Sequence, residues 1–204
     1  MTTNRLEAFS DGVLAVVITI MVLELRVPEG HDLAALWRTT GPGLLTYVLS
    51  FVYVGIYWNN HHHLFQLTRR ITGAVLWANM LLLFWLSLLP FTTAWIDESH
   101  FARVPVMVYG IDLLCAALSW YLMQTLIVRG DADANAALAR ALGRDLKGKI
   151  SSVLYLAGIA AAAFIDEGSV VPKVVAMGMF LATAVLWLIP DRRMERVIIE
   201  EEGL

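Results

Sequence analysis

Polar side chains interrupt the start of the first long apolar stretch of the sequence. Arg5 stands four residues before Phe9, and Ser10 and Asp11 follow, so the stretch reads R-x-x-x-F-S-D. Serine and aspartate near the start of a helix can accept hydrogen bonds from its open backbone N–H groups. Within a membrane such groups avoid lipid and face protein or water. The motif therefore predicts either a capping device or a buried polar network that holds this helix against its neighbours.

One face of the same stretch is an apolar seam that contains a hydroxyl group. Spacings of four and then three residues give the series Arg5, Phe9, Gly12, Val16, Thr19, Leu23 and Arg26. A seam of this period suits a helix that faces copies of itself around an axis. Apolar rings can close a pore by dewetting, and hydroxyl groups can replace part of the water around a cation. We interpret this helix as the lining of an ion pathway. The alternative for Thr19 is a hydroxyl bonded back to its own helix.

Three consecutive histidines, His61 to His63, raise the question of a metal site. Consecutive residues on a helix point about 100° apart, so the three rings cannot all reach one ion. No acidic or cysteine ligand lies near them in the sequence, and we expect no metal or cofactor. One or two of these rings are instead expected to join a polar cluster with Trp58, Asn59 and Asn79 around Arg5 and Asp11.

A single acid, Asp112, lies well inside another apolar segment. Ionisable groups at membrane depth often mark ion or proton pathways. Two interpretations stay open. Asp112 could serve a proton-coupled transporter together with His61–His63, or it could be a hydrogen-bonded acid in a helix–helix contact. The sequence contains no nucleophile–base pair, phosphate-binding loop or haem-attachment motif, so we do not expect an enzyme.

The composition is that of an integral membrane protein. The chain is 58% hydrophobic and 16% charged, with a mean hydropathy of +0.66, whereas soluble domains are about 45–50% apolar and about 25% charged. No basic patch suggests nucleic-acid binding. We expect an all-α polytopic protein with one domain over residues 1–204. Its six membrane-spanning segments are expected at about 6–25, 41–60, 73–95, 104–128, 150–165 and 171–189.

The basic residues sort to the two sides of this arrangement very unequally. Eleven of the 15 fall on the side of the two termini, and four fall on the other side, namely Arg26, Arg38, Arg103 and Lys173. Basic residues collect on the cytoplasmic side of membrane proteins, which predicts cytoplasmic N- and C-termini. We also expect a short amphipathic helix within residues 129–149 and a charged tail over residues 192–204.

The R-x-x-x-F-S-D motif and the following GVLAVVITIMVL closely resemble the first helix of the transmembrane protein 175 family, which comprises the lysosomal potassium channel and its bacterial relatives. The resemblance continues through YWNNHHHLF at Tyr57–Phe65 and NMLLLFWLSLLPFTT at Asn79–Thr93. Animal members carry two six-helix units in one chain. One unit here resembles a bacterial member, and the resemblance implies a homotetramer in the cell membrane with a pore lined by the first helix.

The resemblance also implies roles for individual residues. It places the apolar constriction on Val16, the selectivity threonine on Thr19, and further pore-facing positions on Ile20 and Leu23. Because Val16 is small, Leu23 is a rival for the narrowest ring. The network that anchors the pore helix is expected to comprise Arg5, Phe9, Ser10, Asp11, Trp58, His62 and Asn79. The expected function is a leak-type potassium-selective channel without the TVGYG carbonyl filter, with potassium ions near Thr19. The alternative is the proton-coupled transporter.

Overall fold

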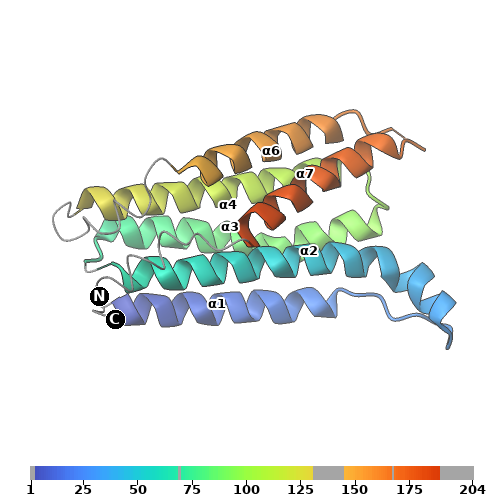
Figure 1. Cartoon of the computed structure of the whole chain (residues 1–204). Coiled ribbons are helices and arrows are strands. Elements are labelled where there is room, and N and C mark those ends of the chain that lie inside the picture. Colours follow the sequence, from blue (N-terminus) through green and yellow to red (C-terminus); the bar gives the residue numbers. More distant parts are fainter. Residues whose placement is uncertain (1–2, 69, 131–144, 167, 189–204) are drawn as a thin grey trace.

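The structure is a computed structural model that describes residues 3–68, 70–130, 145–166 and 168–188. All regular secondary structure in these ranges is helical, which confirms the all-α prediction with six long helices (Figure 1). The predicted amphipathic helix within residues 129–149 and the tail at 192–204 lie almost entirely outside the described residues. The helices are α1 (Thr3–Leu23), α2 (Leu33–Gln66), α3 (Gly73–Glu98), α4 (Arg103–Gly130), α6 (Leu146–Ala162) and α7 (Val171–Leu188).

The helices run side by side along one long axis and alternate in direction (Figure 1). Helix α1 lies at one edge of the bundle and packs against α2 and α3, while α4, α6 and α7 pack against one another towards the other edge. We call the end at which α1 begins the basic end. Its described basic residues are Arg5, Arg70, Arg129, Lys147 and Lys149.

Five helices are long and apolar enough to cross a membrane. The exception is α6, which has 17 residues and begins with a charged turn that contains Lys147 and Lys149. It nevertheless runs beside α4 and α7 as part of the same bundle (Figure 1). The protein is therefore a multi-pass membrane protein.

The predicted start of the second helix was wrong. We expected it at Gly41, after a Gly-Pro-Gly sequence, but α2 begins at Leu33 and Asp32 caps it by accepting a hydrogen bond from Ala35 N at 2.6 Å. Proline removes one backbone donor and usually ends or bends a helix. Here the helix continues through Pro42, and Figure 1 shows α2 bending near its start.

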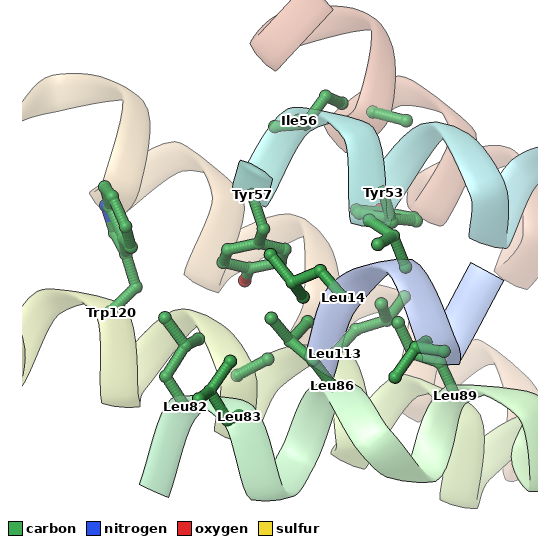
Figure 2. Packing of buried hydrophobic residues seen from close by; sticks show 14 of the residues in the cluster. Leu14, Tyr53, Ile56, Tyr57, Leu82, Leu83, Leu86, Leu89, Leu113 and Trp120 are labelled. Carbon is green, nitrogen blue, oxygen red and sulfur yellow. The ribbon is translucent and has the colours of Figure 1, made fainter. Parts of the chain in front are cut away.

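The buried core fixes the orientation of α1. Leu14 lies with Leu86 of α3 and Leu113 of α4 in the buried hydrophobic cluster (Figure 2), and the other buried α1 residues follow at helical spacing. They are Leu6, Ser10, Val17 and Met21. Because these positions share one face of a helix, the opposite face of α1 is left without a partner in the described chain.

Candidate functional site

The unpartnered face of α1 carries the residues that we predicted to line a pore. Val16 is 54% exposed and Leu23 is 80% exposed, and Thr19 and Ile20 are exposed as well. Val17, directly beside Val16 in the sequence, is only 4% exposed. Within a membrane protein, an apolar face of this kind must meet lipid, another copy of the chain, or a pore.

The four predicted pore residues do not all point in one direction. At about 100° per residue, Leu23 lies close to the direction of Val16, while Thr19 and Ile20 lie to either side of it, about 100° apart. Ile20 lies on the side towards α3, where it lines an open groove with Val16, whereas Thr19 and Leu23 do not line this groove. Val16 and Leu23 therefore define the centre of the open face.

The groove has a volume of about 900 Å³ and runs between α1 and α3. Phe9 and Gly12 of α1 also line it, together with Phe91 and Trp95 of α3, whose rings stack with centroids 5.6 Å apart. Apart from Glu24, Glu98 and Ser87, the lining is apolar. Phe9 was predicted to belong to the anchoring network, and the structure places it in this groove instead.

The Thr19 hydroxyl donates a hydrogen bond to the carbonyl oxygen of Val16 at 2.9 Å. The Thr19 hydroxyl is therefore bonded back to its own helix in this structure, as the alternative interpretation expected. The same bond directs the hydrogen towards the helix and leaves the oxygen lone pairs free to contact a cation or water. Back-bonding and a role in the ion pathway are thus compatible at this position.

A buried chain of hydrogen bonds fastens the other face of α1. Asn79 Nδ2 of α3 donates to Ser10 Oγ at 3.0 Å, and Asn79 Oδ1 accepts from His61 Nε2 of α2 at 2.9 Å. Ser10 in turn donates to the carbonyl oxygen of Leu6 at 2.9 Å. All three side chains are fully or almost fully buried. The chain therefore links α1, α2 and α3 where little water can compete for these groups.

Two further contacts join α1 to α2 at positions more exposed than this buried chain. Trp58 Nε1 donates to Asp11 Oδ1 at 3.0 Å. His62 Nδ1 lies 2.5 Å from Glu7 Oε1, and Gln66 Nε2 donates to His62 Nε2 at 2.9 Å. With Nε2 accepting, the proton of His62 is on Nδ1 and is directed at Glu7.

Of the expected network, the structure brings two pairs of residues together. Ser10 contacts Asn79, and Asp11 separately contacts Trp58. His62 joins α1 through Glu7, a residue that the sequence did not single out. Arg5 is exposed and makes no hydrogen bond or ion pair within the described ranges.

We expected one or two of His61–His63 to lie beside Asn79 and named His62 in the anchoring network, whereas the structure places His61 there. Tyr53, Tyr57 and His61 recur at a spacing of four along α2, and all three are buried. His62 is one position out of this register and is therefore only partly buried. A reading of the buried stripe of α2 would have selected His61 as the partner of Asn79.

Asp112 belongs to a different polar cluster, between α3 and α4. It is 2% exposed, and its Oδ2 accepts a hydrogen bond from Thr92 at 3.2 Å. Close by, Ser50 bonds to Thr93 at 2.7 Å and to Tyr109 at 3.0 Å. In the described residues no histidine contacts Asp112, and no group of three potential ligands could hold a metal ion. The geometry matches an acid in a helix–helix contact.

Comparisons with known proteins agree on one family. Residues 5–90 match the family described as the endosomal/lysosomal potassium channel TMEM175. A potassium channel of Chryseobacterium sp. is 48% identical over 98% of this chain and 100% of its own length. The human protein described as the endosomal/lysosomal proton channel TMEM175 is 39% identical, over 52% of this chain and 23% of its own length. The crystal structure of a lysosomal potassium-selective channel TMEM175 homolog from Chamaesiphon minutus superposes with a TM-score of 0.73 and 27% identity, and the match covers 93% of this chain and 97% of that one.

Proposed function

Because this chain belongs to the TMEM175 family, we propose that it is a potassium-selective channel of the leak type. In this proposal four copies of the chain surround a central pore, and α1 of each copy lines it. The observation that carries the proposal is the division of α1 into a hydrogen-bonded, buried face and an open apolar face that contains Thr19. The names of the relatives support potassium as the ion.

Assembly is required because one helix cannot enclose a pore. The groove between α1 and α3 offers a second copy an apolar docking surface with the stacked rings of Phe91 and Trp95 at its wall. Ile20 and Phe9, on the groove side of α1, would then contact the neighbouring copy. Val16 and Leu23 would point at the axis. Thr19 would lie beside them on the side of α1 opposite to Ile20.

Selectivity in such a pore would come from dehydration and hydroxyl contacts. A ring of Val16 side chains would exclude water, and an ion would lose part of its hydration shell to pass. The Thr19 oxygens, one helical turn away, would replace some of that water. Potassium loses its shell at a lower cost than sodium, which favours its passage.

The hydrogen bonds on the buried face would hold the pore face in position. Ser10, Asn79 and His61 prevent rotation of α1 about its own axis, because rotation would leave buried polar groups unpaired. Arg5 and Phe9 would take part through contacts with neighbouring copies. We further propose that the basic end faces the cytoplasm of a cell whose plasma membrane holds the protein, in line with the excess of basic residues there.

The test is the reversal potential of purified protein in a planar bilayer, with potassium on one side and sodium on the other. The proposal predicts a reversal close to the potassium equilibrium potential. The Thr19→Ala substitution should move it towards zero. The matched control is Thr125→Ala, which removes an equally back-bonded hydroxyl from α4, where Thr125 donates to the carbonyl oxygen of Tyr121 at 2.8 Å.

Other outcomes would redirect the assignment. A current that reverses near zero would leave a cation pore without potassium selectivity. A reversal that follows a pH gradient would favour proton conduction, the activity in the names of the vertebrate relatives. Saturable flux without channel current, lost on Asp112→Asn, would favour the transporter.

A further inference from the structure

A second cavity lies at the basic end, away from α1. It has a volume of about 220 Å³ and opens between α2, α4, the start of α6 and the end of α7. For comparison, an engineered cavity of about 150 Å³ in another protein admits benzene. This one has room for part of a larger organic molecule.

Aromatic rings form the inner wall of the cavity. Tyr53, Tyr57 and Tyr155 line it, and the ring of Trp120 meets that of Tyr57 edge-on with centroids 6.1 Å apart (Figure 2). These four residues are buried. They make an apolar surface that suits a hydrocarbon chain better than a polar solute.

The outer wall is continuous with the surface that faces the bilayer. Leu118 and Tyr121 of α4 line the cavity and are 51% and 56% exposed. A molecule can therefore enter sideways from lipid. Trp187, also in the lining, donates its indole N–H to Ser151 at 2.7 Å, an arrangement typical of the boundary between hydrocarbon and head groups.

Among the described residues, two side chains of opposite charge line the mouth of the cavity. Lys149 lies near the start of α6 and Asp145 caps that start, and both line the cavity. Asp145 Oδ1 accepts a hydrogen bond from Gly148 N at 3.1 Å as the helix cap. Lys149 is exposed. A purely anionic ligand would meet the lysine and the acid at once, whereas a ligand with both charges would be matched by the pair.

We propose that this cavity is a site for a phospholipid whose head group carries both a phosphate and a primary ammonium group, such as phosphatidylethanolamine. Part of one acyl chain lies among the aromatic rings. The phosphate lies at Lys149 and the ammonium group at Asp145. The bound lipid joins α2 to α6.

The head group decides which lipid binds. An acyl chain gains little by leaving the bilayer for an apolar cavity, because lipid tails are as apolar as the side chains around them. The preference therefore comes from charge-assisted hydrogen bonds at the mouth. Phosphatidylglycerol lacks the ammonium group, and phosphatidylcholine has a methylated one that cannot donate hydrogen bonds to Asp145.

The experiment measures lipid binding to the purified full-length chain by native mass spectrometry and by the shift in unfolding temperature. The three lipids are supplied with identical palmitoyl and oleoyl chains, and glycerophosphoethanolamine supplies the head group without chains. We expect phosphatidylethanolamine to be retained and to raise the unfolding temperature most. Lys149→Ala should weaken its binding about tenfold, the change for one charge-assisted contact.

Two further variants distinguish binding at this site from a general effect of surface charge on lipid binding. Asp145→Asn keeps a helix-capping oxygen but removes the charge, so it should abolish the preference over phosphatidylglycerol while leaving the fold intact. Arg129→Ala removes an exposed positive charge at the same end that does not line the cavity, and it should change nothing.

Several results would overturn the proposal. Equal binding of all three lipids in the wild type, or equal binding in Lys149→Ala and wild type, would remove the head-group assignment. An equal shift from glycerophosphoethanolamine would show that no acyl chain is bound. Lipid binding only after removal of residues 189–204 would identify the tail of the chain as the natural occupant.

Discussion

Substitution of Asn79 tests the buried hydrogen-bond chain behind the proposed pore helix. Asn79→Ala removes the bond to Ser10 and the bond to His61, which measure 3.0 and 2.9 Å. Ser10 keeps its bond to the carbonyl oxygen of Leu6. The His61 Nε2–H, however, would be left as a buried donor without an acceptor. We expect both a loss of stability and a looser attachment of α1.

The size of the effect follows from these two bonds. Hydrogen bonds between membrane helices average about 0.6 kcal/mol and reach about 1.7 kcal/mol. An unpaired buried donor costs about 1–3 kcal/mol. Since one donor and two bonds are affected, we expect Asn79→Ala to lower the unfolding free energy by about 1–3 kcal/mol. The control, Asn59→Ala, removes an exposed asparagine of α2 and should cost less than about 0.5 kcal/mol.

The assay is a double-mutant cycle in detergent with Ser10→Ala, Asn79→Ala and the double variant. If Ser10 and Asn79 act through one shared bond, their effects will be non-additive by at least about 0.5 kcal/mol. The same variants should show altered potassium selectivity in bilayer recordings, because α1 would be free to rotate. Additive losses, or an unchanged reversal potential in a destabilised Asn79→Ala protein, would refute the reasoning that this chain of bonds positions the pore face.

Three further predictions concern the proposed pore, the helix packing and the buried acid. Val16→Asn should wet the constriction and raise the single-channel current more than Leu23→Asn does; the reverse order in bilayer recordings would move the narrowest ring to Leu23. Gly158→Ala should lower the unfolding temperature, at a cost of about 1–3 kcal/mol, because its new Cβ would lie 2.5 Å from a ring atom of Phe180. The control Gly178→Ala meets nothing within 4 Å and should not lower the unfolding temperature. Asp112→Asn keeps an acceptor for Thr92, so potassium current should persist, and its loss in well-folded protein would contradict the purely structural role.

Much of the fold could be predicted from the sequence because the spacing of apolar residues indicates which of them are buried. The apolar segments of spanning length predicted the six helices, and the seam of α1 predicted which of its residues stay outside the core. Val16 and Leu23 are exposed while Leu14 and Val17 are buried. A period of 3.6 residues fixes such a division before any tertiary contact is known.

The errors arose where tertiary contacts override local preference. Pro42 is a strong local signal for a helix boundary, yet α2 continues through it. The Thr40 hydroxyl, two residues earlier, is bonded to Arg26 O outside the helix at 2.7 Å. Three adjacent histidines alone do not show which one contacts Asn79, because that depends on which of them faces the core. The cavity beside α6 was not predicted because no sequence motif marks it.

The central claim is that α1 lines the ion pathway, and thiol accessibility tests it most directly. Cysteine is introduced at Val16, at its buried neighbour Val17, and at the exposed Leu118 of α4, in a chain in which Cys115 is replaced by serine. Silver ions, which are small enough to enter a cation pore, are then added during recording. The account predicts rapid, irreversible loss of current for Val16→Cys alone. Equal inhibition of Val16→Cys and Leu118→Cys, or no inhibition of Val16→Cys, would contradict it.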